Sequence, residues 1–225
     1  MISPLAYVDP AAKIGKNVTV QPFAYIEADV EIGDDSIIMS GARILSGTRM
    51  GKGNKVHHGA VLGSEPQDFH YTGEHTLLVI GDKNDIRENV VISRGTHEGQ
   101  YTQIGNENYL MDGVHLCHDV KIANHCVLGI KTTVAGDCCI DSYVILSSNV
   151  LLQQNCHIGS WSLVQSGCRI SKDVPPYIIM AGNPAEYHGV NAMVLQHKNQ
   201  VTDRILRHIM NAYRLAVSYT HLRAH

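Results

Sequence analysis

The amino-acid sequence predicts an all-β fold, a parallel β-helix of hexapeptide repeats with a short C-terminal α-helical tail. Three observations support this prediction. An aliphatic residue or methionine occupies 26 of the 29 positions reached by counting in sixes from Ile2 to Ile170. Aromatic residues make up only 6% of the 225 residues, fewer than a conventional core of this size would hold. The chain also contains 20 glycines, which favour short strands joined by turns.

The six-residue period indicates which side chains point into the predicted prism. Neither a helix nor a long alternating strand repeats every six residues, whereas a short strand followed by a turn does. The aliphatic residue and the small residue four positions later, such as Val20 and Ala24, should both point inward. Three units would close a triangular coil of about 18 residues, and successive coils would stack through parallel ladder hydrogen bonds.

Two loops interrupt the repeat, at about 63–79 and 94–103. They contain the three residues that break the count, Asp68, Glu74 and Glu98. The aliphatic count resumes in phase after each loop, so each loop should replace whole repeats. Long loops that leave a rigid scaffold often carry function, and both are therefore candidate parts of a site.

The pattern divides the chain into a β-helix domain, 1–175, and a C-terminal exit segment and helical region, 176–225. Pro175 and Pro176 should end the ladder, because proline has no backbone N–H to donate. Thr202 is a candidate N-cap, and Ile205, Ile209 and Tyr213 follow at a helical spacing of four. Residues 190–225 hold five Lys or Arg and one acid, so the tail is the basic part of the chain.

Composition also excludes several classes of protein. No run of about 18 apolar residues is present, so we expect no membrane span. No leader with a basic and an apolar region precedes the repeat, and we expect a cytoplasmic protein. Four cysteines stand at the small, inward-pointing position and should be free buried thiols, as in a reducing compartment: Cys126, Cys138, Cys156 and Cys168. No Cys-x-x-Cys pair suggests a metal site, and we expect no nucleic-acid partner.

The register also singles out His118, which we expect to act as a general base. It occupies the third position of its repeat, at a corner, and should point outward. Gly136 lies at the same corner one coil later, and because glycine has no Cβ, an oxyanion could approach its N–H. Gln154 follows one coil further on. Asp119, next in sequence to His118, could orient the imidazole.

Two other interpretations of these histidines stay open. Histidines at turns are commonly surface residues with no catalytic role. The register also places Gln100 below His118 and His97 one coil below His115, so that His97, His115 and His118 could form a cluster that binds zinc or iron. We expect no metal, because the hexapeptide-repeat carbonic anhydrases that use three histidines need neither the first loop nor the helical tail.

Several segments together resemble one family. They are Gln67–Glu74, Ile80–Asp82, Ile86–Glu88, Arg94–Thr96, His115–Asp119, Asp173–Tyr177 and Gly189–Asn191. In this order they are similar to the cytosolic UDP-N-acetylglucosamine O-acyltransferases that begin lipid A synthesis, which are left-handed β-helices and form homotrimers. The likeness extends over residues 1 to about 215, and the first loop, the His-x-x-His-Asp motif and the Gly-Val-Asn exit are its specific parts.

The resemblance implies a reaction and a set of site residues. A 3-hydroxyacyl group would pass from acyl carrier protein to the 3-hydroxyl of UDP-N-acetylglucosamine, with no cofactor beyond the phosphopantetheine of the carrier. His118 matches the general base, Asp119 its partner, and Gly136 the residue whose N–H faces the oxyanion. Seven further residues match positions that bind or line the substrate: Asp68, His70, His115, Gln154, Asn191, His197 and Lys198. Ser166 matches a position near the acyl chain.

The chain departs from the family at three places. The basic residues that often contact phosphate after the Gly-Val-Asn exit are reduced here to His197 and Lys198. His70 stands where a lysine is common, so a fixed charge is replaced by a titratable one. Residues 217–225 do not match the family, and the helical region is therefore interpreted as truncated. Two alternatives to the implied function remain: a sugar acyl- or acetyltransferase that uses a coenzyme A donor or another acceptor, and a non-catalytic β-helix scaffold.

Overall fold

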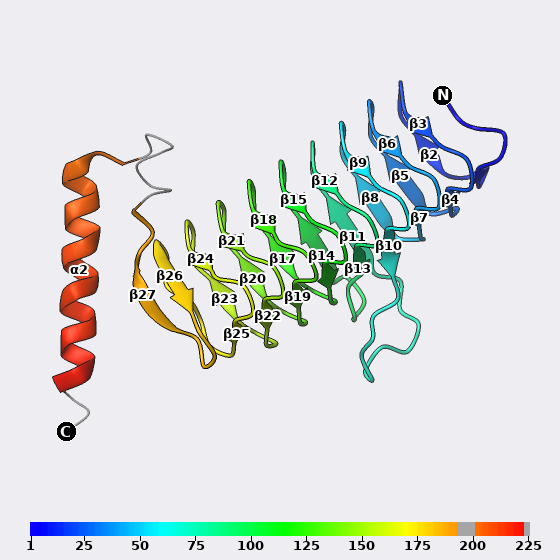
Figure 1. Ribbon diagram of the computed structural model, residues 1–225. Coiled ribbons are helices and arrows are strands. Elements are labelled where there is room, and N and C mark those ends of the chain that lie inside the picture. The colour runs from blue at the N-terminus through cyan, green and yellow to red at the C-terminus, as the bar shows by residue number, and fades with distance from the viewer. Residues whose placement is uncertain (193–200, 223–225) are drawn as a thin grey trace.

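A computed structural model describes residues 1–192 and 201–222 of the chain. Three parallel sheets form the faces of a prism, and the helix α2 (Asp203–Leu222) lies beyond its C-terminal end (Figure 1). Each coil passes through the three sheets in turn. We call the turn from the first sheet to the second the first corner, the next turn the second corner, and the turn back to the first sheet the third corner.

The strands of the prism are short, and each pairs with the equivalent strand of the neighbouring coils. The first sheet contains β1 (Tyr7–Val8), β4 (Tyr25–Ile26), β7 (Arg43–Ile44), β10 (Val61–Ser64), β13 (Val91–Ser93), β16 (His115–Leu116), β19 (Thr133–Val134), β22 (Leu151–Leu152) and β25 (Arg169–Ile170). The second contains β2 (Lys13–Ile14), β5 (Val30–Ile32), β8 (Thr48–Met50), β11 (Leu77–Ile80), β14 (Tyr101–Ile104), β17 (Lys121–Ile122), β20 (Cys139–Ile140) and β23 (His157–Ile158). The third contains β3 (Thr19–Val20), β6 (Ile37–Ile38), β9 (Lys55–Val56), β12 (Asp85–Ile86), β15 (Tyr109–Leu110), β18 (Val127–Leu128), β21 (Ile145–Leu146), β24 (Leu163–Val164), β26 (Ile178–Ala181) and β27 (Glu186–Val190).

The core follows the predicted period. Aliphatic residues of the six-residue count, such as Ile26 and Leu116, are fully buried, and so is the small residue four positions later, such as Ala42. The four cysteines at that small position are buried as predicted. Burial raises the pKa of Cys126 to about 11 and that of Cys138 to about 12, so both thiols stay protonated at neutral pH.

Buried asparagines replace the small residue in three coils, which the period alone does not predict. The side chain of Asn54 donates to the carbonyl of Gly81 (2.8 Å), and its Oδ1 accepts from the backbone N–H of Asn84 (2.9 Å). Asn84 and Asn108 repeat this arrangement, and the column ends where Asn108 accepts from the N–H of Cys126 (2.8 Å). Because every amide in the column has partners in the next coil, these polar groups are buried without being left unsatisfied.

The loops lengthen two coils by whole repeats, as the sequence predicts. Most coils step by 18 residues, as in the contact of Asn106 with Asn124. Across the first loop the step is 30 residues, as between Lys52 and Asp82, and across the second it is 24, as between Asp82 and Asn106. The same repeat positions therefore point into the core before and after each insertion.

The coil that contains the second loop has 24 residues instead of 18, and this corrects two placements that assumed a constant step of 18 residues. His115 pairs with Val91, so His97 does not lie one coil below His115. By the same pairing the residue below His118 is Arg94, not Gln100. Counting fails here because the second loop adds one repeat between the first and second sheets.

The C-terminal segment extends the third sheet past the two prolines. Pro176 lies at the second corner, against Gly159, where it interrupts no strand. The next strand, β26, pairs in parallel with β24, and β27 then pairs antiparallel with β26. The strand ladder thus reaches Ala181, beyond the boundary expected at 175.

Thr202 caps the N-terminus of α2 as predicted, because its hydroxyl accepts from the N–H of Ile205 (3.3 Å). Its contact face is rotated from the predicted one, because Leu206 is buried while Ile205 is exposed. Tyr213 donates to the carbonyl of Pro176 (2.6 Å) and so ties the helix to the prism. No helix within residues 1–192 and 201–222 has both the length and the apolar character that crossing a bilayer requires.

Candidate active site

His118 lies at the first corner, directly after β16, between two carboxylates. Its Nδ1 is 3.0 Å from Oδ2 of Asp119, and its Nε2 is 3.3 Å from Oδ2 of Asp68 in the first loop. The residue is only 8% exposed, although the register places it on the outside of the prism. The first loop folds back over the corner, so the expectation of an open surface residue is wrong for this histidine.

Gly136 lies directly against the imidazole of His118. A Cβ at this position would be 2.5 Å from Cε1 and 2.7 Å from Nε2 of the ring, closer than any real contact. Its N–H makes no hydrogen bond with any residue that the structure describes. The equivalent N–H groups of His118 and Gln154 also make no hydrogen bond within the described part of the chain, so what distinguishes Gly136 is the space that its missing side chain leaves beside the ring.

Asp119 is held in place by the second loop. It adopts a left-handed backbone conformation at the corner, with φ 61°, and its own N–H donates to Oγ1 of Thr102 (2.8 Å). Oδ2 of its carboxylate accepts from the N–H of Thr96 (3.1 Å) and from Nδ1 of His118 (3.0 Å), and Oδ1 faces the same N–H of Thr96 at 3.4 Å. A carboxylate anchored in this way can fix the orientation and tautomer of a neighbouring imidazole.

Asp68 links His118 to His70. Its Oδ1 accepts from the backbone N–H of His70 (2.7 Å) and lies 2.8 Å from the Nδ1 of the same residue. The backbone N–H of His70, followed by its side chain, lowers the pKa of Asp68 below its usual value, with a smaller contribution from His118. Asp68 is therefore a carboxylate at neutral pH, held against the imidazole.

The remaining predicted residues that the structure describes make no hydrogen bond or ion pair with the imidazole of His118. Gln154 stands on the same corner, one coil beyond Gly136, and donates to Asp137 Oδ2 (3.0 Å). His115 faces outward from β16, and partial burial lowers its pKa. Ser166 lies at the third corner, on another edge of the prism.

Asn191 is separated from His118 within this chain. It is 2% exposed and lies at the second corner, where its side chain donates to the carbonyl of Trp161 (2.9 Å). Its N–H donates to Tyr177 (2.7 Å), so Asn191 anchors the exit segment to the prism. His197 and Lys198 lie outside the described residues.

The described residues contain no group of three or more His, Cys, Asp or Glu side chains arranged to hold a metal ion. The cluster of His97, His115 and His118 considered from the sequence depended on the stacking of His97 below His115, which the strand pairing contradicts.

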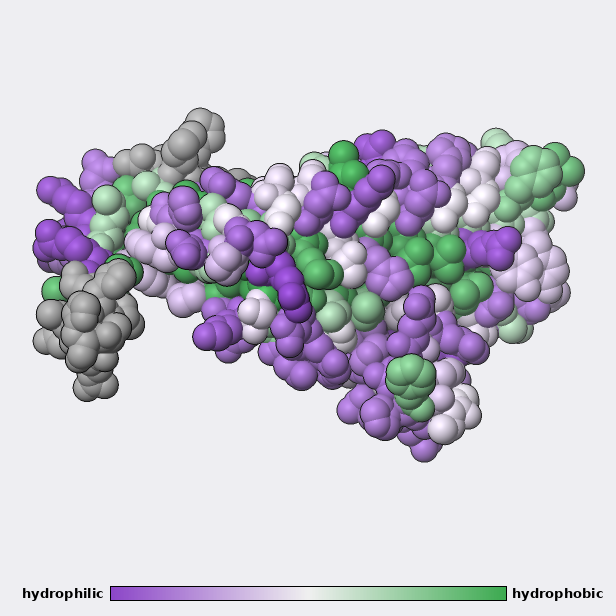
Figure 2. Space-filling model, turned by 60° about the horizontal axis from the view of Figure 1, so that its bottom comes forward, coloured by the Kyte–Doolittle hydropathy of each residue, from purple (hydrophilic) through white to green (hydrophobic). Residues whose placement is uncertain are grey.

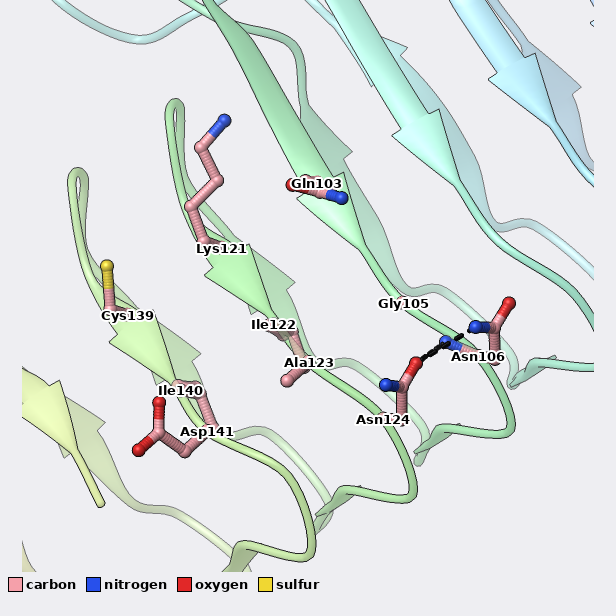
Figure 3. Close-up of a pocket in the computed structure, with 10 residues that line it drawn as sticks. All are labelled: Gln103, Gly105, Asn106, Lys121, Ile122, Ala123, Asn124, Cys139, Ile140 and Asp141. Atoms are coloured by element: carbon pink, nitrogen blue, oxygen red, sulfur yellow. Dashed lines mark hydrogen bonds between the residues drawn. The ribbon is translucent and has the colours of Figure 1, made fainter. Parts of the chain in front are cut away.

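A polar groove on the second sheet is separate from this site (Figure 3). Gln103, Lys121 and Cys139 point outward from three adjacent strands, and Asn124 accepts a hydrogen bond from the N–H of Asn106 (2.7 Å). None of the predicted site residues lines the groove.

Sequence reasoning missed four residues that hold the site together: Arg94, Thr96, Thr102 and Asp137. The motif Arg94–Thr96 was visible as part of the family resemblance, but its contacts depend on how the two loops fold. Thr102 and Asp137 carry no signal in the repeat pattern.

A β-helix of hexapeptide repeats with a carboxylate-bound histidine at one corner defines the class of hexapeptide-repeat transferases. The bacterial transferase hexapeptide model accordingly matches residues 11–46 and 29–64. The model described as UDP N-acetylglucosamine O-acyltransferase, domain 2, matches residues 173–223. The chain belongs to the UDP-N-acetylglucosamine O-acyltransferase family and has its left-handed β-helix fold.

Relatives that the chain covers over most of their length support this assignment. The chain is 39% identical over 216 residues to the acyl-[acyl-carrier-protein]–UDP-N-acetylglucosamine O-acyltransferase of Stutzerimonas stutzeri, with 96% of this chain and 83% of the relative covered. It superimposes on the crystal structure of LpxA, a UDP-N-acetylglucosamine acyltransferase from Bacteroides fragilis, with a TM-score of 0.93 and 49% identity over 95% of this chain and 84% of that one. LpxA from Acinetobacter baumannii gives a TM-score of 0.92 at 34% identity, with 95% and 83% covered. The scaffold alternative is therefore set aside, and the chain is an acyltransferase.

Proposed function

We propose that this chain transfers a 3-hydroxyacyl group from acyl carrier protein to the 3-hydroxyl of UDP-N-acetylglucosamine, the first step of lipid A synthesis. The observation that carries the proposal is the imidazole of His118, held by Asp119 on one side and facing Asp68 on the other, beneath the free N–H of Gly136. This arrangement supplies a base and an oxyanion donor at one point, as acyl transfer to a hydroxyl requires.

The roles of the two carboxylates follow from the ring nitrogens that they face. With a proton on Nδ1 donated to Asp119, the lone pair of His118 lies on Nε2, which faces Asp68. Two lone pairs facing each other do not attract, so a substrate hydroxyl can displace Asp68 from Nε2 and donate to that nitrogen. Asp68 then becomes free to accept from another hydroxyl of the sugar.

The chemical step moves one proton and one acyl group. His118 takes the proton of the sugar hydroxyl as that oxygen bonds to the thioester carbonyl carbon. The negative charge that develops on the carbonyl oxygen faces the N–H of Gly136. The intermediate then expels the thiol sulfur of phosphopantetheine, which takes the proton back from His118 as the carbon–sulfur bond breaks.

A direct assay tests the proposed substrates. Purified protein is mixed with UDP-N-acetylglucosamine and a panel of acyl carrier proteins bearing 3-hydroxyacyl groups of different lengths, and with the same groups on coenzyme A. Ester formation with carrier-bound donors only is expected. Turnover restricted to coenzyme A donors would favour the alternative transferase, and failure of UDP-N-acetylglucosamine to raise the melting temperature would remove it as the acceptor.

A homotrimer is also part of this proposal, supported by the character of the three faces. The third sheet exposes an apolar row outward, comprising Val127, Ile145, Leu163 and Ile179 on successive strands. The first sheet exposes Val61, Val91 and Leu151, whereas the second exposes charged residues such as Lys13, Glu31 and Arg49. Figure 2 shows an apolar band along one face of the prism, between hydrophilic rows.

Packing of the third sheet against the first sheet of a neighbour closes a ring around a threefold axis. The second corner of one copy, which carries Asn191, then lies beside the first corner of the next, which carries His118. Ile145→Glu should therefore give monomers without activity, while Gln103→Glu on the charged second sheet should stay trimeric. A wild-type protein that sediments as a monomer at micromolar concentration refutes the trimer.

We place the protein in the cytoplasm. The buried free cysteines support this location, because such thiols are typical of reducing compartments.

A further inference from the structure

Arg94 makes contacts that the proposed mechanism does not use. It lies at the first corner one coil before His118, and its side chain is only 13% exposed. Its Nη1 donates to the carbonyl of Gly63 (3.0 Å) and its Nη2 to the hydroxyl of Tyr71 (2.7 Å). The guanidinium carbon also stands 5.6 Å from the centre of the Tyr71 ring.

Within the described residues, every polar partner of this guanidinium belongs to the first loop or to the strand that leads into it. The nearest carboxylate, on Glu65, is 3.5 Å away and largely exposed. A nearly buried cation with so little charge compensation destabilises a fold unless its hydrogen bonds are well formed. The planar fork of arginine satisfies both acceptors at once, which lysine cannot do.

The loop turn that Arg94 holds is the one that carries Asp68. The N–H of Tyr71 donates to the carbonyl of Asp68 (3.2 Å), so fixing Tyr71 fixes the backbone of Asp68. The other end of the loop is tied to the prism by His75 and Asp29 (2.8 Å). Just before Tyr71, Phe69 and His70 are exposed, whereas Asp68 reaches His118.

We propose that Arg94 is a positioning residue, which sets Asp68 against Nε2 of His118 by clamping Tyr71 and Gly63. Two residues later, the N–H of Thr96 holds Asp119 on the other side of the ring. The short segment from Arg94 to Thr96 therefore places both carboxylates that flank the imidazole. The expected fall in kcat rests on the proposed function, whereas the expected loosening of the first loop does not.

The test uses two variants that break the clamp and two matched controls. Arg94→Met and Tyr71→Phe remove the clamp from either side. Arg87 bonds the hydroxyl of Tyr109 (3.2 Å) and a glutamate in the same coil, at the third corner away from His118. Arg87→Met and Tyr109→Phe therefore remove equivalent contacts elsewhere.

Four results are expected for the protein. First, hydrogen–deuterium exchange of residues 64–76 rises in Arg94→Met and Tyr71→Phe but not in the controls. Second, kcat falls by about 10- to 100-fold in Arg94→Met, since a displacement of about 1 Å at a reacting group can cost that much. Third, Arg94→Met changes kcat less than threefold in an Asp68→Asn background, because Arg94 acts through Asp68. Arg94→Lys restores only part of the rate, because its ammonium reaches one acceptor.

The outcomes separate this inference from the proposed function. Unchanged exchange of the loop overturns the clamp whatever the activity. If the kcat losses of Arg94→Met and Asp68→Asn multiply in the double variant, Arg94 does not act through Asp68 and its role is only structural. A wild type with no transferase activity but with the expected exchange result refutes the proposed function and leaves the clamp standing.

Discussion

Replacing Gly136 by alanine tests whether the space beside His118 matters for catalysis. The added Cβ would lie 2.5 Å from Cε1 of the imidazole, whereas ordinary contacts begin at 3.4 Å. The ring must therefore move by about 1 Å, away from its 3.0 Å bond with Asp119. A displacement of that size lowers turnover by about 100-fold, or about 2.7 kcal/mol of transition-state stabilisation.

The assay compares initial rates of acyl transfer at saturating substrates for Gly136→Ala and a control, Gly41→Ala. Gly41 has a φ of 75° and no atom nearer than 3.8 Å to an added Cβ, so alanine there strains the backbone without touching the site. The control should lower the melting temperature and keep kcat. Gly136→Ala should keep the melting temperature and lower kcat. A kcat near that of the wild type in this variant would refute the idea that the space beside Gly136 is needed to position His118.

Four further expectations concern catalysis, docking, thiol reactivity and acid stability. His118→Ala should lower kcat by about 10²–10⁴-fold, with a smaller change in the affinity for UDP-N-acetylglucosamine; retention of kcat would exclude it as the base. The Michaelis constant for the acidic acyl carrier should rise with ionic strength, because the C-terminal region is basic; a constant value would argue against docking there. Iodoacetamide should label the exposed Cys139 in the folded protein and spare Cys138, whose pKa burial raises to about 12, as peptide mapping would reveal. Hydrogen bonds from Arg87 lower the pKa of Glu88 from 4.5 to about 2, so its contribution to stability should be present above pH 4.5 and be lost as the pH falls towards 2. Glu88→Gln should therefore reduce the difference in melting temperature between pH 7 and pH 3, and an unchanged difference would contradict this.

The sequence predicts the fold well because its main determinant is periodic and local. Each coil buries an aliphatic residue and a small one, so the count of sixes identifies the core from Val20 to Ile170 directly. The position of Gly136 beside His118 could be predicted for the same reason, since no loop intervenes between their coils.

The loops mark the limit of that reasoning. The alternation of inward and outward residues fixes the register only up to a whole repeat, so the count cannot tell how many repeats a loop takes out of the prism. His97 was misplaced by one repeat for this reason. The burial of His118 was missed because it depends on contacts of Asp68 and Arg94 that are distant in sequence.

The buried asparagines could not be assigned from a pattern of apolar and small residues. Asn84 replaces a small side chain, and the groups that satisfy its amide belong to the coils before and after it. Those partners exist only once the coils have stacked, so a single repeat does not reveal them.

The lengths of the two loops have a consequence for how such a chain can change over time. Both insertions are multiples of six residues, and the ladder beyond each is undisturbed. An insertion of any other length that was not looped out would shift the six-residue phase of the downstream sequence and move core side chains into water. Insertions and deletions of whole repeats therefore preserve the phase of this ladder. An inserted residue that is not part of a whole repeat must be accommodated in a loop or a local bulge.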